Sequence, residues 1–214
     1  MVTRHLIAVL VMVGALTGTA WAQAPPWASE YAALRAKAER GDAKAQAELG
    51  GWYLLGEGVP KDYTQAEAWY RKAADQGYAG AQLSLGWMYE LGRGVPKDET
   101  QAAAWWRKAA DLGQASAQYN LGYLYLIGRG VQTDAVQAME WYHKAADQGH
   151  AQAEKDLGVL YFKGQGVARD YVEAHKWYSI AASRVSASLQ QIFAAGRDEI
   201  AALMTPQQLA EAQQ

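Results

Sequence analysis

The sequence predicts an all-α fold, a solenoid of helix–turn–helix repeats with a 36-residue period. The blocks 41–76, 77–112, 113–148 and 149–184 align without gaps, and many of their columns are identical in all four copies. A fixed period of this length is typical of solenoid proteins, in which each repeat packs on its neighbours. Half of the 214 residues are hydrophobic, so the helices have enough apolar surface to stack.

Residues 1–22 have the pattern of a secretory signal peptide. A short positive segment precedes an apolar run, Leu6–Leu16, which is about half as long as a membrane-spanning helix needs to be. Ala20–Ala22 matches a small-x-small cleavage site. We therefore expect a mature chain that starts at Gln23, is periplasmic or secreted, and has no membrane span. An uncleaved membrane anchor is the alternative for this segment.

Residues 23–40 are predicted to form a short leader and an N-terminal capping helix. The segment Ser29–Arg40 carries charged residues at helical spacing and precedes Gly41, as a later second helix precedes Gly77. Such a polar end is expected because the terminal unit of a repeat array has no neighbour to cover it.

Each repeat is predicted to contain two helices joined by a tight glycine turn. Tyr53 and its equivalents mark the apolar face of the first helix. Gly56 and Gly58 end that helix, because glycine adopts positive φ without a steric cost. Asp62 then caps the second helix, and Gln65 three residues later completes a capping-box pattern.

Two further columns predict how the repeats contact one another. Trp69 and its equivalents are expected to fill the space between layers, where truncation of one Trp to Ala costs roughly 3 to 5 kcal/mol. Gly50 lies inside the first helix, where glycine costs about 1 kcal/mol relative to alanine. Its presence in all four copies therefore predicts the close approach of another backbone.

Residues 185–214 are predicted to form C-terminal capping helices. Ala187, Leu189 and Phe193 fall near the columns of a fifth first helix, but the glycine turn is missing. Thr205 starts a second capping-box pattern with proline at the first helical position, which predicts a short terminal helix.

The four copies share the pattern A-x-A-x-x-x-L-G-x-x-Y-x-x-G-x-G-V-x-x-D-x-x-x-A-x-x-W-x-x-x-A-A over residues 41–184. This pattern resembles the Sel-like (suppressor-enhancer-of-lin-like) repeats, which are relatives of the tetratricopeptide repeats. The resemblance implies a right-handed solenoid whose first helices line the concave side. It also implies an exported bacterial protein that acts as an adaptor or a regulator of envelope signalling. Some secreted relatives carry paired cysteines, whereas this chain has no cysteine.

The sequence predicts no enzyme, cofactor or metal site. The glycine turns lack the Gly-Lys-Ser/Thr ending of a phosphate-binding loop. No serine has a lysine three residues later, which argues against a β-lactamase-like hydrolase. His143, His150 and His175 lack metal-ligand spacing, and His143 is expected to face solvent because it shares a column with Arg71 and Arg107. The formal net charge of -2 argues against a nucleic-acid partner.

The varying columns of the first helix are the predicted partner-binding surface. Positions i, i+4 and i+7 lie on one largely apolar face, and Trp and Tyr are concentrated in the two middle copies. Aromatic anchors of this kind are typical of protein-binding sites. The candidate partner-binding residues are Leu83, Trp87, Glu90, Tyr119, Asn120, Tyr123, Leu126, Val159 and Phe162. Ordinary core packing is the alternative for the aromatic residues among them.

We therefore expect a monomeric, non-catalytic scaffold or adaptor of the cell envelope that binds a protein or peptide partner in its concave groove. A peptidoglycan-binding module is the alternative function, in which exposed Trp and Tyr rings stack on sugars. A β-lactamase-like hydrolase is a second alternative, which the missing nucleophile motif disfavours.

Overall fold

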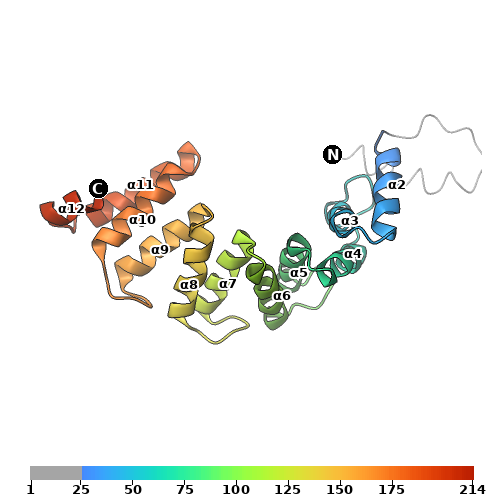
Figure 1. Cartoon of the computed structure of the whole chain (residues 1–214), viewed down its shortest axis with the longest axis horizontal. Helices are drawn as coiled ribbons and strands as arrows, with labels where there is room; N and C mark the ends of the chain where they lie inside the picture. The colour runs from blue at the N-terminus through green and yellow to red at the C-terminus, as the bar shows by residue number, and fades with distance from the viewer. Residues whose placement is uncertain (1–25) are drawn as a thin grey trace, which may run out of the picture. The chain divides into compact units, whose positions relative to one another are not determined.

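The computed structural model describes residues 26–214, so the expected signal peptide lies outside the described residues. The described part of the chain contains eleven α-helices and no strand (Figure 1), which confirms the all-α helical repeat solenoid. The helices are α2 (Pro26–Glu39), α3 (Ala43–Leu55), α4 (Tyr63–Asp75), α5 (Ala79–Leu91), α6 (Glu99–Asp111), α7 (Ala115–Ile127), α8 (Ala135–Ala146), α9 (Ala151–Lys163), α10 (Tyr171–Ser183), α11 (Ala187–Ala201) and α12 (Pro206–Ala212).

Each predicted repeat is a helical hairpin, formed by α3 with α4, α5 with α6, α7 with α8, and α9 with α10. The first helix ends where Gly56 adopts a left-handed conformation with a φ of 77°, and the Gly56 N–H donates to the Trp52 carbonyl oxygen over 2.8 Å. Gly58 also has positive φ, and the other three copies repeat both features. The predicted glycine turn is therefore confirmed in all four repeats.

The second helix begins at an aspartate that ties the two helices together. The Asp62 carboxylate accepts hydrogen bonds from the N–H groups of Thr64 and Gln65, over 2.9 and 3.0 Å, which confirms the predicted cap. The Asp62 N–H donates to the carbonyl oxygen of Tyr53 over 2.9 Å. This bond to the first helix stands in place of the reciprocal bond expected from a capping box. The same arrangement recurs at Asp98, Asp134 and Asp170.

The glycine inside each first helix makes room for an aromatic ring. A Cβ atom at Gly50 would lie 2.9 Å from the ring of Tyr70, and one at Gly122 would lie 2.7 Å from the ring of Tyr142. The closest neighbour of this glycine is therefore a side chain, whereas the sequence predicted a backbone. A backbone carbonyl oxygen, that of Ala138, is a secondary contact at 3.1 Å from the Gly122 position.

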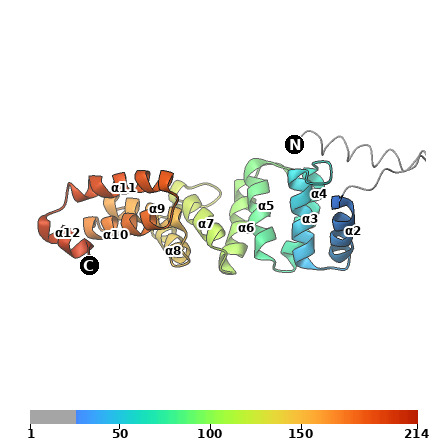
Figure 2. The same ribbon diagram turned by 90° about the horizontal axis from the view of Figure 1, so that it is seen from above.

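The chain divides into two compact units, with the boundary between Trp105 and Trp106 inside α6. The first unit contains α2 to α5, which lie side by side in Figure 2, and the second unit contains α7 to α12. The predicted Trp column is buried at Trp69 and Trp105 in the first unit and at Trp141 in the second, and its fourth member, Trp177, is half-buried. The repeats therefore stack within each unit as the identical columns predict.

The N-terminal helix α2 covers the first repeat. Leu34 and Ala38 are buried in a cluster with Leu49 of α3. The hydroxyl groups of Tyr31 and Tyr53 lie 2.9 Å apart and share a hydrogen bond. The expected capping helix therefore forms, although it begins at Pro26, three residues before the expected start.

The C-terminal helices α11 and α12 both pack on α10. Phe193 is buried as its column predicts, but Leu189 is exposed, so the expectation that Leu189 would occupy a core column was wrong. Thr205 forms the complete predicted capping box with Gln208: each residue accepts a hydrogen bond from the backbone N–H of the other.

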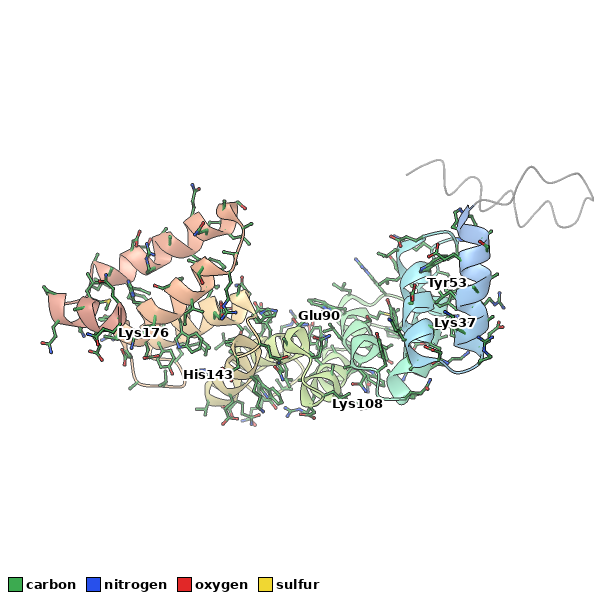
Figure 3. The ribbon with its side chains drawn as sticks, turned by 45° about the horizontal axis from the view of Figure 1, so that its top comes forward. Lys37, Tyr53, Glu90, Lys108, His143 and Lys176 are labelled. Atoms are coloured by element: carbon green, nitrogen blue, oxygen red, sulfur yellow. The ribbon has the colours of Figure 1, made fainter. Side chains whose placement is uncertain are left out.

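His143 does not face solvent as its column suggests. Its half-buried ring, labelled on α8 in Figure 3, has Tyr161 and Trp177 as neighbours. It lies edge-on to both rings, with centroid distances of 6.3 and 5.4 Å. Arg71 has an equivalent environment in the first unit, where its guanidinium lies over the Trp105 ring. The prediction was wrong because a column of arginines does not imply full exposure when the side chain packs along an aromatic surface.

Candidate functional site

A trough lies between the first helices α3 and α5 of the first unit. It consists of two hollows of about 270 and 350 Å³ that share Ser84. The smaller hollow, which we call the turn-end hollow, is lined by Leu54, Ser84, Trp87, Met88, Leu91 and Arg93. The larger hollow, which we call the helix-start hollow, is lined by Lys44, Ala47, Glu48, Tyr70, Tyr78, Gly80 and Ser84. Because the hollows lie at opposite ends of the same two helices, the trough follows the helix axes.

The turn-end hollow is mainly apolar, with one cation at its edge. Trp87 is 44% exposed and Leu91 is 50% exposed, so a partner can reach both side chains. The Ser84 hydroxyl donates to the Gly80 carbonyl oxygen over 3.0 Å, so its proton is used within α5. Arg93 lies in the glycine turn directly after α5 and is exposed.

Small residues on α3 leave the trough open. Ala47 lines the helix-start hollow with only a methyl group. Gly51, one turn further along α3, has no side chain, and a Cβ atom built there would meet only the Tyr70 hydroxyl, at 3.5 Å. The depth of the trough therefore follows from the size of two residues that differ from their counterparts in the other repeats.

In the second unit, the equivalent space between α7 and α9 contains Tyr119 in the position of Ala47. The Tyr119 ring stacks on Tyr142 and His150, with centroid distances of 5.5 and 4.7 Å. Its hydroxyl donates to the Asp156 carboxylate over 3.2 Å, and Lys155 forms an ion pair with the same carboxylate. A side chain of the repeat itself therefore occupies the space that is open in the first unit.

Burial favours the neutral forms of the Tyr119 and Tyr142 hydroxyls and of the His150 imidazole. Burial raises the pKa of the Tyr119 and Tyr142 hydroxyls, and the nearby Asp156 carboxylate raises both further. Burial lowers the pKa of His150, whose Nδ1 accepts a hydrogen bond from the Ala153 N–H over 3.3 Å. A hydroxyl with a raised pKa is a weak nucleophile, so this cluster is suited to packing and not to catalysis.

The structure separates the nine predicted site residues by exposure. Trp87 and Tyr123, at 44% and 43%, are the exposed ones among the nine. Leu83, Glu90, Tyr119, Leu126, Val159 and Phe162 are half-buried. Asn120 is 7% exposed, so it cannot contact a partner without rearrangement. Figure 3 labels Glu90 on α5 in the first unit.

A second exposed column was missed by the sequence interpretation. Leu55, Leu91 and Ile127 are each the last residue of a first helix, and all three are exposed. Leu91 and Ile127 follow Trp87 and Tyr123 by four positions, so in each case the two residues form one exposed apolar strip on the helix surface. The available signal was an apolar residue directly before the glycine turn in three successive copies.

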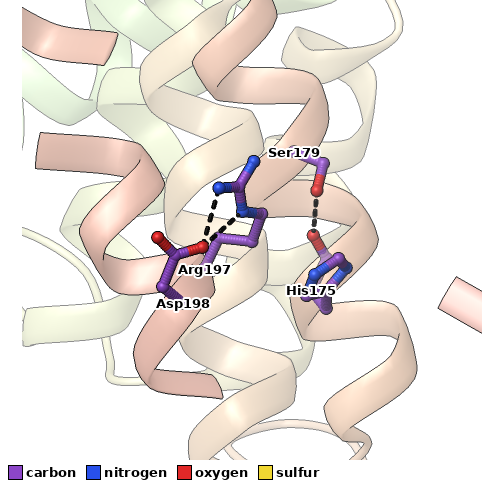
Figure 4. Close-up of polar contacts among 4 residues, drawn as sticks. All are labelled: His175, Ser179, Arg197 and Asp198. Atoms are coloured by element: carbon purple, nitrogen blue, oxygen red, sulfur yellow. Dashed lines mark hydrogen bonds and ion pairs between the residues drawn. The ribbon is translucent and has the colours of Figure 1, made fainter. Parts of the chain in front are cut away.

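His175 and Ser179 on α10 do not form a catalytic pair (Figure 4). The Ser179 hydroxyl donates to the backbone carbonyl oxygen of His175 over 2.9 Å, and not to its ring. Burial lowers the pKa of His175, and the neighbouring Arg197 guanidinium lowers it further. Arg197 itself pairs with Asp198 over 2.7 Å. A catalytic triad needs the imidazole to accept the hydroxyl proton, which this geometry does not provide.

Within residues 26–214, no group of three or more His, Cys, Asp or Glu side chains is arranged to hold a metal ion. Over the same residues, each helix is too short or too polar to cross a lipid bilayer.

The chain matches the profile of the Sel1 repeat at residues 43–78, 79–114, 115–150 and 151–185. Each match starts two residues after the predicted start of the repeat, because the profile begins each repeat at the first helix.

The solved structures that resemble this fold include two with a TM-score of 0.71. One is c5321, described as a protective antigen present in uropathogenic Escherichia coli strains; it is 47% identical over 73% of this chain and 33% of its own length, with a TM-score of 0.71. The other is a Sel1 repeat protein from Oxalobacter formigenes, 34% identical over 79% of this chain and 72% of its own length, also with a TM-score of 0.71.

A similar curated protein is EsiB of Escherichia coli, named as a secretory immunoglobulin A-binding protein. It is 55% identical over 40 residues, which are 19% of this chain and 8% of EsiB. The chain therefore spans less than a tenth of EsiB and one third of c5321.

Proposed function

The chain belongs to the Sel1 repeat family, whose members generally mediate protein–protein interaction, and we propose that it is a non-catalytic scaffold of the bacterial cell envelope. The scaffold binds an extended segment of a partner protein along the trough between α3 and α5. The observation that carries this proposal is Trp87, a large aromatic side chain that is 44% exposed beside an apolar hollow. Buried aromatic anchors supply most of the binding energy in protein interfaces.

The dimensions of the trough suit a short extended peptide. A helix of 13 residues, the length of α3 and of α5, is about 20 Å long at 1.5 Å per residue. An extended chain of about six residues covers the same distance. A segment of this length can place apolar side chains against Trp87 and Leu91 and reach the helix-start hollow at its other end.

The second unit offers a smaller contact surface, formed by Tyr123 and Ile127 on α7. Here the neighbouring Tyr119 occupies the space between the helices, so a partner meets a raised strip and not a trough. We assign Tyr123 a supporting role in recognition. Asn120 is left out of the proposed surface because it is buried.

The envelope location is supported by the signal-peptide pattern of residues 1–22, which leads us to propose an exported mature chain that can contribute to envelope signalling. The names of two relatives are consistent with recognition outside the cytoplasm: EsiB is named for binding secretory immunoglobulin A, and c5321 is named as a protective antigen.

The proposal is tested with Trp87→Ala and Tyr123→Ala, separately and together. Val136→Ala and Ile180→Ala, on the second helices α8 and α10, are the matched controls because these side chains are also large, apolar and exposed. Partner proteins are crosslinked in the native host, recovered, and identified by mass spectrometry, after circular dichroism has established that each variant is folded. We expect Trp87→Ala to lose most of the recovered partner and the controls to retain it.

Equal recovery by Trp87→Ala, Tyr123→Ala and the controls would reject the proposed surface. A second outcome separates the glycan alternative, which is favoured by the exposed Trp87 and Tyr123 rings because flat aromatic faces stack on sugars. A scaffold for proteins remains in the supernatant with purified peptidoglycan, whereas a glycan-binding module sediments with it and loses this property in the double variant.

A further inference from the structure

The turn-end hollow has an exposed cation, Arg93, at its edge. Arg93 lines this hollow together with Leu54, Trp87 and Leu91. Its guanidinium lies 5.8 Å from the centroid of the Tyr63 ring, and no carboxylate of residues 26–214 pairs with it. A guanidinium at the rim of an apolar hollow is a ready partner for a carboxylate on an incoming ligand.

Three other arginines and one lysine of the described range pair with carboxylates. Arg35 pairs with Glu39 over 2.8 Å, and Arg184 pairs with the buried Glu154 over 3.0 Å. Arg71 donates through Nε to Glu67 over 2.6 Å. Lys97, four residues after Arg93 in the same turn, pairs with Glu99 over 3.4 Å. Among these cations, Arg93 combines exposure with a position on the proposed docking trough.

The size of the turn-end hollow limits its occupant. At about 270 Å³ it lies below the lower end of the range for small-molecule and cofactor sites, which is roughly 300 Å³. A single apolar side chain is therefore a better match than a cofactor. The trough continues from Ser84 into the helix-start hollow, which gives room for the residues that precede this side chain in a peptide.

An extended peptide places successive side chains on opposite sides. An acidic residue directly next to the apolar one would therefore point away from Arg93. The carboxylate and the apolar side chain can share one small hollow when both belong to the same residue, and this is the case only for a residue at the carboxyl terminus of a chain.

We propose that the turn-end hollow, with Arg93 at its edge, binds the carboxyl-terminal residue of a partner protein. The apolar side chain of that residue lies against Trp87 and Leu91, and its α-carboxylate pairs with Arg93. The inference rests on the proposed function of the trough and specifies the end of the partner that enters it. Backbone carboxylate capture is a known mode of peptide recognition.

The probes are three N-acetylated hexapeptides. The first is Ala-Ser-Ala-Ser-Ala-Phe with a free carboxylate, the second is the same peptide with a carboxyl-terminal amide, and the third is the amide with Glu at the fourth position. Binding to the full mature chain is followed by the indole N–H resonance of Trp87, which is assigned with Trp87→Phe. The protein variants are Arg93→Gln and, as a control that removes one positive charge from the same turn, Lys97→Gln.

We expect the free-acid peptide to bind about tenfold more tightly than either amide. Arg93→Gln lowers the affinity of the free acid to that of the amide in the same variant, while Lys97→Gln retains the difference. Equal affinities for acid and amide, a preference that survives Arg93→Gln, or the absence of any Trp87 shift at millimolar free-acid peptide would each overturn the proposal. An amide with internal Glu that binds as tightly as the free acid also overturns it, in favour of an internal acidic residue.

These outcomes differ from failure of the proposed function. If the carboxylate preference is absent but Trp87→Ala still loses its crosslinked partner, the trough is a docking site and only the terminal-carboxylate assignment is wrong. If Trp87→Ala retains its partner, the docking site itself is wrong.

Discussion

The two units of this protein are built from the same repeat, yet they use the space between successive first helices in opposite ways. In the first unit, Ala47 leaves a trough between α3 and α5. In the second unit, Tyr119 stands at the equivalent position and stacks on Tyr142 and His150. The surrounding residues differ less, since Tyr70 corresponds to Tyr142. The difference in side-chain volume between Ala47 and Tyr119 therefore decides whether the space between two first helices is open or filled.

The comparison shows how a repeat array divides its columns between stability and recognition. Several apolar helix columns that are identical in all copies, such as Leu49 and its equivalents, are buried in both units. A column that varies can serve either purpose, and the choice depends on the residue that faces it from the next helix. Exchange of residues between the two units tests this division.

The largest expected effect is on the stability of the second unit. Tyr119→Ala removes a ring that contacts Tyr142 and His150, and it removes the hydrogen bond to Asp156. Because the ring is half-buried, we expect the free energy of unfolding in urea to fall by about 2 to 4 kcal/mol. Tyr119→Phe keeps the ring and loses only the hydrogen bond, so its loss should be about 0.5 to 1.5 kcal/mol.

Tyr123→Ala is the matched control, since it makes the same chemical change on the same helix at a position that is exposed. We expect it to cost less than about 1 kcal/mol. If Tyr119→Ala and Tyr123→Ala destabilise the protein equally, Tyr119 does not pack in the way that separates the two units.

The reverse exchange, Ala47→Tyr, is expected to close the trough. The new ring can stack on Tyr70 and Tyr78 as Tyr119 stacks on Tyr142 and His150. The stacking gain of about 0.5 to 1.5 kcal/mol offsets much of the overpacking cost, so the stability should change by roughly 1 kcal/mol or less. Partner binding should fall by at least about tenfold, which is about 1.4 kcal/mol.

Ala68→Tyr is the control for this exchange, because Ala68 is exposed on the second helix α4. It adds the same ring outside the trough and should leave partner binding unchanged. Crosslinked-partner recovery and peptide titration both report on the result. A folded Ala47→Tyr variant that binds its partner normally would show that the trough is not the docking surface.

The local structure of each repeat could be predicted from the sequence because it depends on residues close together in the chain. Gly56 takes positive φ and Asp62 caps the second helix as expected. The exposure of Trp87 and the packing of Tyr119 between helices could not be predicted in the same way. Helical periodicity fixes the direction of a side chain, but not which residue of the next repeat it meets.

Two predictions missed the closest neighbour of a residue, and for the same reason. Gly50 suggested a close backbone, whereas its partner is the ring of Tyr70, which comes from the second helix of the same repeat. His143 was expected to face solvent because it aligns with arginines, whereas the ring lies against Tyr161 and Trp177 of the following repeat. In both cases the alignment identified an equivalent position correctly, and only the structure identified its partner.

The smallest expected effect concerns acid sensitivity, which also differs between the units. His143, His150 and His175, which are all of the histidines within residues 26–214, lie in the second unit, and burial lowers the pKa of each. At a pH between its folded and unfolded pKa values, a histidine with a lowered pKa is neutral in the folded state and protonated in the unfolded chain. The second unit should therefore lose stability as the pH falls below the ordinary histidine pKa of about 6.5, and should retain it above that value.

Exchange of His150 with its counterpart Tyr78 isolates one of these contributions. The His150 ring stacks on Tyr119, and protonation of Nδ1 would remove the acceptor of the Ala153 N–H, while the nearby Asp156 carboxylate partly opposes the lowering of the pKa. His150→Tyr should therefore lose less stability than the wild type between pH 7.5 and pH 5. Because the ring is only half-buried, the difference should be below about 1 kcal/mol.

Hydrogen exchange read by mass spectrometry resolves this effect by unit. The buried Glu154 changes stability in the opposite direction as the pH falls, because burial raises its pKa, but it is present in both proteins and cancels in the comparison. Tyr78→His is the reciprocal variant and should introduce acid sensitivity into peptides from the first unit, where the wild type shows little. Identical pH profiles for His150→Tyr and the wild type would mean that the stacked imidazole is not a source of the difference between the units.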